Sequence, residues 1–535
     1  MSITNVENRT PAAAGGAVQA DSDATPDGLP AGLEAVHRLH DAEASRRLDA
    51  MATERHGVPG IVLMRRAGAA AFDRLRRQWP AARSLTVLCG RGNNAGDGYV
   101  IAGIAIARGF SVQLLQVTDA AALKGDAARA RDWALGEGVV IEPFVAPGAL
   151  RGELIVDALL GTGIRGVVRP EFAAAIETVN AVAALGRPVL AIDLPSGLCA
   201  DTGAALGCAV RAAATITFIC AKRGLFTGAG PAHAGTVHFD GLGVPTSLSE
   251  AVDAPTGVPL LRLGLGDLQL PRRARDAHKG HFGHLLVVGG DVGTGGAVAM
   301  AAETALRSGA GLVSAATRAD HSAVLLARAP ELMVRPIAAR GELLPMLERA
   351  STVVIGPGLG TGPWGEQLLD AALECDRPLV LDADALNLLA VRQARYPARR
   401  DDWVLTPHPG EAARLLGTDT ATIAADRFAA VAELQRRYGG AVILKGAGTL
   451  VADAQGTALC AYGNPGMASG GMGDVLAGLI GSLRAQGLEP GRAARLGVCL
   501  HGAAADLAVV ETGERGLLAT DLLPFLGHWL RGIER

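Results

Sequence analysis

The stretch GNPGMASGGMGDVLAG, residues 463–478, places glycines and a single aspartate directly before an apolar run. Glycines in such a place either permit a turn or let backbone N–H groups approach an anion closely. Asp474 can cap the helix that the apolar run predicts, or it can exchange protons with a substrate. A helix cap does not require the preceding SGGMG, whereas an anion site does. We therefore interpret the stretch as an anion cradle and Asp474 as an acid–base residue that can also cap the helix.

The rest of the second half repeats one pattern, in which a short apolar run is followed by a loop and an Ala-rich segment. Apolar strands that alternate with helices predict a parallel sheet covered on both faces, whose strand-end loops meet at one edge. These loops suggest a nucleotide site beside a reactive centre, although no Walker A motif is present. The loops are GGDVGTGG (289–296), IGPGLGTG (355–362), LTPHPGE (405–411) and VILKGAGT (442–449).

The first half shows the same alternation, so the sequence predicts two α/β units in series. The expected strands are SLTVLCG (84–90), SVQLLQV (111–117), ELIVDALLG (153–161), PVLAIDLPSG (188–197) and ATITFIC (214–220). We divide the chain into a disordered extension (1–33) and domains at 34–250 and 260–535, and we interpret residues 246–276 as a linker or domain-entry segment.

Three loops of the first half carry polar residues at predicted strand ends: CGRGNNAGDGYV (89–100), VDALLGTGIRG (156–166) and AIDLPSGLCADTG (191–203). Asp157, Asp193 and Ser196, together with Asn93 and Asn94, would form an oxygen-rich pocket at one edge. Such a pocket suits a hard cation and a polar substrate.

These three loops, with GVPGIVLMRRAG (57–68) and CAKRGLFTGAG (220–230), resemble the NAD(P)H-hydrate epimerase family over residues 34–245. The resemblance implies that Asn94, Asp157 and Ser196 bind a potassium ion. It also implies that Asp193 contacts the substrate, where its carboxylate can serve as the acid–base group for inversion of a hemiaminal carbon. The residues implied to hold the hydrated nicotinamide nucleotide are Asn93, Asn94, Ala95, Gly96, Asp97, Gly161, Thr162, Gly163, Ile164, Arg165, Gly166 and Val167.

The opening stretch resembles the ribokinase-like fold, in which GMGD forms an anion hole. Together with HKGHFGHLLVVGG (278–290), IGPGLG, TPHPGE and KGAGT, it resembles the ADP-dependent NAD(P)H-hydrate dehydratase family over residues 260–535. By this resemblance the adenine nucleotide contacts Lys445, Gly446, Ala447, Gly448, Thr449 and Gly473, and the hydrated substrate faces Ala297, Gly358, His408 and Asp474.

Two departures from the family patterns bear on these sites. The first loop usually reads NNGGD, so Ala95 adds a methyl group that we expect to be tolerated but that would narrow the phosphate cradle. Met472 stands where Thr is common, which removes a hydroxyl but leaves the backbone cradle. Ser469 keeps the hydroxyl of the usual Thr.

Only four of the 50 basic residues are lysines, so each deserves inspection. We assign Lys124 to chance and Lys445 to the nucleotide, and we find no role for Lys279. Lys222 is either a phosphate contact or a surface residue.

Composition excludes several classes of protein. The formal net charge of −3 gives no basic face for nucleic acid, and no run of about 18 uncharged apolar residues predicts a membrane span. Seven scattered cysteines without a CxxC suit a reducing cytoplasm and give no zinc signature, and the chain shows no signal peptide. We expect a cytoplasmic homo-oligomer with small-molecule substrates only.

The predicted fold is therefore an N-terminal Rossmann-like three-layer α/β/α domain followed by a ribokinase-like α/β domain. The predicted function is repair of NADHX and NADPHX: the first domain interconverts the R and S epimers, and the second dehydrates the S epimer. For the second step we expect ADP and Mg²⁺, with a transient phosphoryl transfer that activates the hydroxide leaving group. The alternatives are a ribokinase-like kinase for a vitamin-like alcohol, which shares the GMGD element, and a first domain that only binds a protein or RNA.

Overall fold

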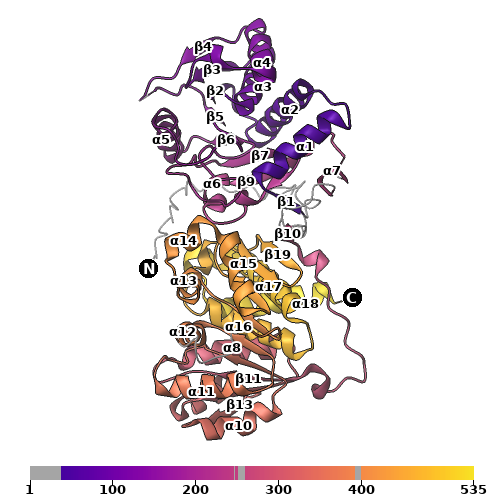
Figure 1. Ribbon diagram of the computed structural model, residues 1–535, viewed down its shortest axis with the longest axis vertical. Helices are drawn as coiled ribbons and strands as arrows, with labels where there is room; N and C mark the ends of the chain where they lie inside the picture. The colour runs from indigo at the N-terminus through magenta and orange to yellow at the C-terminus, as the bar shows by residue number, and fades with distance from the viewer. Residues whose placement is uncertain (1–37, 147, 246, 251–259, 392–398, 535) are drawn as a thin grey trace, which may run out of the picture.

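The computed structural model describes residues 38–534 except 147, 246, 251–259 and 392–398. The expected extension at 1–33 lies outside the described residues. Figure 1 shows two lobes stacked along the long axis, with the N-terminal lobe in indigo to magenta and the C-terminal lobe in orange and yellow. Each lobe is built on one sheet, as the alternation of strands and helices predicted.

The smaller sheet is wholly parallel, with the order β4-β3-β2-β5-β6-β7-β9. The order reverses between β2 and β5, as in doubly wound nucleotide-binding folds. Its strands are β2 (Ser84–Cys89), β3 (Ser111–Gln116), β4 (Ile141–Pro143), β5 (Leu154–Ala158), β6 (Val189–Ile192), β7 (Ala214–Phe218) and β9 (Thr236–Asp240). The helices of this lobe are α1 (Ala42–Glu54), α2 (Gly60–Gln78), α3 (Asn93–Ala107), α4 (Gly125–Gly136), α5 (Pro170–Ala184), α6 (Gly230–Ala234) and α7 (Ser247–Glu250).

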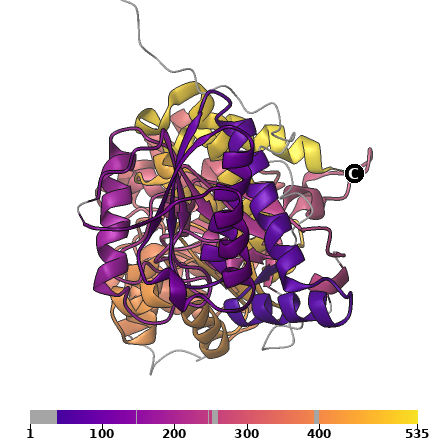
Figure 2. The same ribbon diagram turned by 90° about the horizontal axis from the view of Figure 1, so that it is seen from above.

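Strand alternation makes this lobe three-layered, because successive side chains point to opposite faces of the sheet. Val87 packs in one buried cluster with α2, α3 and α4, whereas its neighbour Leu88 packs in a second cluster with α5. Figure 2, viewed down the long axis, shows the strands between these two sets of helices. The Rossmann-like prediction is confirmed.

The larger sheet has the order β13-β12-β11-β14-β15-β16-β17-β18-β19-β10-β1-β8. The strands are β13 (Met333–Pro336), β12 (Leu312–Thr317), β11 (His284–Val288), β14 (Thr352–Ile355), β15 (Leu379–Leu381), β16 (Trp403–Leu405), β17 (Ala441–Leu444), β18 (Thr449–Asp453), β19 (Gly456–Cys460), β10 (Leu260–Leu263), β1 (Arg38–His40) and β8 (Ala221–Lys222). The run from β13 to β17 is parallel, and β18 is antiparallel to both of its neighbours. This parallel sheet confirms the α/β class predicted for the second unit.

Both faces of the larger sheet are covered. Leu285 and Val287 pack with α8, α16, α17 and α18, whereas Leu286 and Val288 pack with α10, α11, α12, α13 and α15. The helices are α8 (Gly295–Arg307), α9 (Ser322–Arg328), α10 (Arg340–Arg349), α11 (Pro363–Glu374), α12 (Ala383–Val391), α13 (Pro409–Leu416), α14 (Thr420–Ala425), α15 (Arg427–Tyr438), α16 (Met472–Ala485), α17 (Pro490–Thr512) and α18 (Leu522–Ile533). By length and composition α17 is the one described helix that could cross a membrane, and 72% of its most apolar window is buried inside the protein.

The segment 246–276, expected to be a linker or domain-entry segment, is partly a strand of the larger sheet. This strand, β10, pairs with β19 and β1, and β1 pairs in turn with β8. Strands from the first 222 residues therefore extend the sheet of the C-terminal lobe (Figure 1). These strands are only two to four residues long, and their partners lie far away in sequence, so periodicity does not detect them. The domain limits of 34–250 and 260–535 stay predictions.

Candidate active sites

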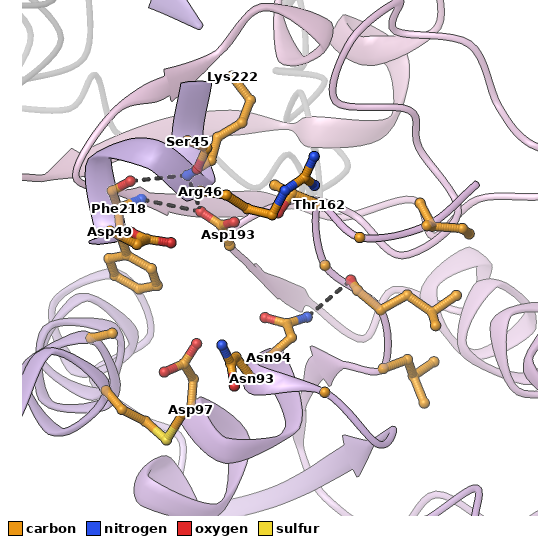
Figure 3. A pocket seen from close by; sticks show the side chains of 18 of the residues that line it. Ser45, Arg46, Asp49, Asn93, Asn94, Asp97, Thr162, Asp193, Phe218 and Lys222 are labelled. Atoms are coloured by element: carbon orange, nitrogen blue, oxygen red, sulfur yellow. Dashed lines mark hydrogen bonds and ion pairs between the residues drawn. The ribbon is translucent and has the colours of Figure 1, made fainter. Parts of the chain in front are cut away.

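A cavity of about 800 Å³ opens at the carboxyl edge of the smaller sheet, between the loops that follow β2 and β5. This is the position at which the strand order reverses, where doubly wound sheets bind ligands. Helix α1 and the end of β7 supply other walls (Figure 3). The predicted substrate residues that line the cavity are Asn93, Asn94, Asp97, Gly161, Thr162, Gly163, Ile164, Arg165, Val167 and Asp193.

Three predicted substrate residues, Ala95, Gly96 and Gly166, are not among the residues that line the cavity. Ala95 lies in the first turns of α3 and is fully buried in the core. The additional methyl group therefore packs against the core and does not narrow the cavity. Any contact of Ala95 or Gly96 with a substrate would be made by the backbone, and this role stays a prediction.

Asp193 directly follows β6 and has a φ of 66°, in the left-handed region that few residues other than Gly, Asn and Asp adopt. Its Oδ1 accepts hydrogen bonds from Lys222 Nζ at 2.5 Å, Thr217 Oγ1 at 3.2 Å and the Phe218 N–H at 3.3 Å. No hydrogen bond to Oδ2 from another described residue is found. One carboxylate oxygen is thus fixed, and the other is available to a ligand.

Lys222 is buried, with 2% of its side chain exposed, so the surface role that the sequence left open is wrong. Burial acts to lower its pKa, but Asp193 and Asp49 outweigh burial and raise that pKa above its usual value. Burial raises the pKa of Asp49 to about 6, and burial with the nearby Asp193 raises the pKa of Asp97 well above its usual value. Figure 3 shows these three carboxyl groups around one space, next to a single ammonium. The cavity therefore holds a carboxylate paired with a lysine beside two carboxyl groups whose pKa values are raised, a set of groups that suits acid–base chemistry.

An oxygen cluster adjoins this cavity at the ends of β5 and β6. The fully buried Asp157 accepts from the Ser196 hydroxyl at 2.5 Å and from the Ser196 N–H at 2.8 Å, and burial raises its pKa to about 6. Asn94 Nδ2 donates to the Leu160 carbonyl at 3.0 Å, whereas its buried Oδ1 accepts no hydrogen bond from the described residues. A buried acceptor without a donor is costly unless a cation or water satisfies it.

The oxygen atoms of Asn94, Asp157 and Ser196 suit a cation that binds neutral oxygen ligands as well as a carboxylate. The described residues contain no group of three or more His, Cys, Asp or Glu side chains that could hold a metal. One carboxylate, one amide oxygen and one hydroxyl suit a singly charged ion better than a transition metal, which prefers nitrogen or sulfur.

The second site lies where β15, β16 and β17 end. Lys445 Nζ lies 2.8 Å from Asp382 Oδ1 and 3.9 Å from Glu411 Oε2. A Cβ atom placed on Gly473 would lie 3.4 Å from Lys445 Nζ. The GMGD turn and the lysine, 28 residues apart in the chain, therefore meet at one point, as the strand-end argument predicted.

Asp474 is not the helix cap. The N-cap of α16 is Gly471, with a φ of 92°, and Asp474 lies inside the first turn. The capping role that the sequence allowed is therefore wrong. Burial and the neighbouring Asp382 raise the pKa of Asp474 to about 7 against the opposing effect of Lys445. A carboxyl group with such a pKa can take and return a proton near neutral pH.

Two further carboxylates, those of Asp382 and Glu411, lie close to Lys445. Burial raises the pKa of Glu411 to about 7. Burial alone would lower the pKa of Lys445, but Asp382, Glu411 and Asp474 hold it above its usual value. The lysine is therefore a permanent cation beside proton-exchanging carboxyl groups.

The other predicted substrate residues lie on the loops after β11, β14 and β16. Ala297 lies in the first turn of α8, and its N–H donates to Thr294 O at 3.2 Å; Thr294 Oγ1 donates to Gly358 O at 2.7 Å. His408 caps α13, where its Nδ1 accepts from the Gly410 N–H at 2.9 Å. Thr294 thus links Ala297 to Gly358. His408 is a helix cap, and its contact with the substrate stays a prediction.

Residues 445–449, here called the nucleotide loop, connect β17 to β18. Thr449 Oγ1 donates to Gly446 O at 3.0 Å, which curls the loop. No hydrogen bond from the N–H groups of Gly446, Ala447 or Gly448 to another described residue is found. Such free N–H groups suit an anion such as a phosphate.

Comparison with known proteins identifies the family. A bifunctional NAD(P)H-hydrate repair enzyme from Coxiella burnetii is 49% identical over 489 residues, which are 91% of this chain and 98% of that relative. The chain belongs to the bifunctional NAD(P)H-hydrate repair enzymes. The Escherichia coli member of this family is 46% identical over 497 residues, 92% of this chain and 93% of that protein.

Two family models match separate parts of this repair enzyme. Residues 60–224 match the YjeF-related protein N-terminus, and residues 285–526 match NAD(P)H-hydrate dehydratase. Among solved structures, the ADP/ATP-dependent NAD(P)H-hydrate dehydratase from Bacillus subtilis, co-crystallized with ATP/Mg²⁺, is 30% identical. The match covers 50% of this chain and 95% of that chain, with a TM-score of 0.45. The family resemblances inferred from the sequence are confirmed.

Sequence reasoning missed several charged residues of the two sites. Asp49 lies on α1, in a stretch without any loop motif, and Asp382 directly follows β15 and was assigned no role. The one available signal was that Asp382 ends an apolar run at the edge where other loops were expected to meet.

Proposed function

We propose that this repair enzyme interconverts the R and S epimers of NADHX and NADPHX in its N-terminal lobe. Its C-terminal lobe then dehydrates the S epimer to NADH or NADPH with ADP as co-substrate. The observation that carries the proposal is that each lobe has its own acid–base cluster at the carboxyl edge of its own sheet. The two relatives that align with 91% and 92% of the chain bear the name of this repair activity.

Epimerisation requires a bond at the hydroxylated ring carbon to break and re-form on the other face. That carbon is a hemiaminal, so when a base takes the hydroxyl proton, a carbonyl forms as the ring C–N bond breaks, and its electron pair and a proton go to the nitrogen. Attack of the nitrogen on the other face of the carbonyl, with return of the proton to the oxygen, restores the ring with inverted configuration. Oδ2 of Asp193 would be the base, with Lys222 orienting the carboxylate through its ion pair with Oδ1. The loops 93–97 and 161–167 would hold the nucleotide across the cavity.

Potassium is the cation that we propose for Asn94, Asp157 and Ser196. Two observations support it: Asn94 Oδ1 accepts no hydrogen bond within the described part of the chain, and the Asp157 carboxylate is buried next to the Ser196 hydroxyl. When bound, the ion supplies a fixed positive charge beside the loop 161–167, where the substrate phosphate would lie.

Dehydration requires a poor leaving group, hydroxide, to be activated. Phosphoryl transfer from the nucleotide to the substrate hydroxyl would create a good leaving group, and Asp474 would accept the hydroxyl proton. Phosphate would then leave with the electron pair of the C–O bond, and the adjacent ring carbon would lose a proton to form the double bond. Lys445 to Thr449 and Gly473 would hold the nucleotide, and Ala297, Gly358 and His408 would face the substrate. Mg²⁺ would neutralise phosphate charge.

The test is a coupled assay with an epimer mixture of NADHX, ADP, Mg²⁺ and K⁺, followed by recovery of the dihydronicotinamide absorbance. The proposal predicts full recovery. No recovery with ADP or with ATP would contradict it, and a stable phosphorylated product would indicate a kinase. A cytoplasmic location, a homo-oligomeric state and the absence of nucleic-acid and membrane partners stay predictions.

A further inference from the structure

The segment 222–228, here called the connector, touches both sites. It begins at Lys222, which pairs with Asp193 in the cavity of the N-terminal lobe. It ends at Thr227 and Gly228, which contact the nucleotide loop of the C-terminal lobe. The connector is part of a motif that the sequence singled out, CAKRGLFTGAG, and the proposed epimerase chemistry uses only its lysine.

Two connector residues bind carbonyl groups of the nucleotide loop. The hydroxyl of Thr227 lies 3.0 Å from Gly448 O and 3.3 Å from Ala447 O, and the Gly228 N–H donates to Ala447 O at 3.2 Å. Thr227 is fully buried, so these bonds are shielded from water. The carbonyls of the loop are thereby fixed, and the N–H groups of the same peptides are fixed with them.

Arg427, at the start of α15, joins the connector to the same loop. Its Nε donates to Thr227 Oγ1 at 3.1 Å, and its Nη2 donates to Leu444 O at 3.2 Å and Lys445 O at 3.3 Å. The side chain is buried, and burial lowers its pKa to about 10, so it is still charged at neutral pH. A planar guanidinium with several directed donors fixes the geometry of the carbonyls that it reaches.

The backbones of the two lobes also approach closely here. Gly448 has a φ of 62°, and a Cβ atom on it would lie 1.8 Å from Phe226 O. Any other residue at this position would force the connector and the nucleotide loop apart.

We propose that Thr227, acting with Arg427, is a positioning residue for the nucleotide, so that the N-terminal lobe completes the nucleotide site of the C-terminal lobe. The inference rests on the proposed function, which places the nucleotide on residues 445–449. It goes further by making a residue of the epimerase half determine the affinity of the dehydratase half for ADP.

The experiment compares three full-length variants with the wild type by calorimetric titration with ADP and Mg²⁺, repeated with ATP and Mg²⁺. Thr227→Val removes the hydroxyl at nearly constant volume, and Thr227→Ser retains it. Thr215→Val is the matched control, because Thr215 is also a fully buried threonine of the N-terminal lobe that donates to a carbonyl, at 2.7 Å from Ala234 O.

Loss of the loop contacts is expected to weaken nucleotide binding in Thr227→Val by roughly tenfold, which corresponds to a tenfold higher KM for ADP at a nearly unchanged kcat. Thr227→Ser and Thr215→Val should bind as the wild type does, and all variants should melt cooperatively. Wild-type affinity in Thr227→Val, or an equal loss in Thr215→Val, would overturn the inference and leave the proposed function standing. A wild-type protein that binds neither nucleotide would overturn both.

Discussion

Nζ of Lys222 lies 2.5 Å from Oδ1 of Asp193, inside a cavity that both residues line. The ammonium also donates to Phe218 O at 2.9 Å, so the lysine is held from two sides. The ion pair keeps one oxygen of the carboxylate occupied and leaves the other toward the cavity. The proposed epimerase activity depends on this relationship.

Asp193→Asn should lower the rate of epimerisation by roughly 10²- to 10⁴-fold, the usual contribution of a general base. Asparagine is the appropriate substitution because it tolerates the left-handed backbone at φ 66°, whereas alanine would add strain. Chromatographic separation of the two epimers measures the rate. Dehydration of purified S epimer serves as the internal control, and interconversion at the wild-type rate would exclude the role of Asp193.

Lys222→Met should also slow epimerisation, by roughly tenfold or more, because a misplaced base loses much of its effect. Methionine fills the buried volume without the charge. The matched control is Lys124→Met, since Lys124 is exposed and lies outside the cavity lining. Equal rates for the two variants would show that the ion pair has no part in the reaction.

Asn94→Ala should raise the concentration of K⁺ needed for half-maximal epimerisation. The variant loses the buried Oδ1 that accepts no hydrogen bond from the described residues, and with it one proposed ligand of the ion. A titration with KCl at constant ionic strength, balanced with choline chloride, measures the effect. An epimerisation rate that does not respond to K⁺ in the wild type would contradict the cation assignment.

The dehydratase reaction should depend on pH through Asp474, whose pKa burial raises to about 7. As a base the carboxyl group must be ionised, so kcat/KM for the S epimer should rise with pH through about 7 and then level off. Asp474→Asn should remove this dependence together with most of the activity. A flat wild-type profile between pH 5 and pH 8, roughly two units below and one unit above a pKa of 7, would be inconsistent with this role.

Asp474 should also lower the free energy of unfolding at high pH. A pKa that folding raises from an ordinary 3.8 to about 7 means that the folded state binds the proton more tightly. Stability is therefore lost as pH rises through this window, and the loss is complete above about pH 7. Asp474→Asn should melt above the wild type at pH 8 and close to it at pH 4. The opposite order, measured by calorimetry at both pH values, would contradict the assigned shift.

Much of the fold was predictable because its core strands are continuous apolar runs. The five runs given as expected strands of the first half correspond to β2, β3, β5, β6 and β7 of the smaller sheet. The short strands β1, β8 and β10 were not predictable, since each is stabilised by partners far away in sequence. Local pattern carries no information about such pairings.

The two sites were predictable to the extent that glycine-rich loops mark them. Asp193, Asp474 and Lys445 lie where the strand-end argument placed them. The charged partners of these side chains were not predictable, because Asp382 is 63 residues from Lys445 and Lys222 is 29 residues from Asp193. Only the folded chain brings these pairs together and shows Gly471, and not Asp474, as the cap of α16.

Purified (R)-NADHX as the only substrate, with ADP, Mg²⁺ and K⁺, tests most directly whether the two sites act in sequence. Because the proposed dehydratase accepts the S epimer, recovery of NADH from the R epimer requires both sites. The wild type should recover all of the NADH, Asp193→Asn should recover it no faster than spontaneous epimerisation allows, and Asp474→Asn should equilibrate the epimers without forming NADH. Rapid NADH formation from the R epimer by Asp193→Asn would show that epimerisation does not require Asp193.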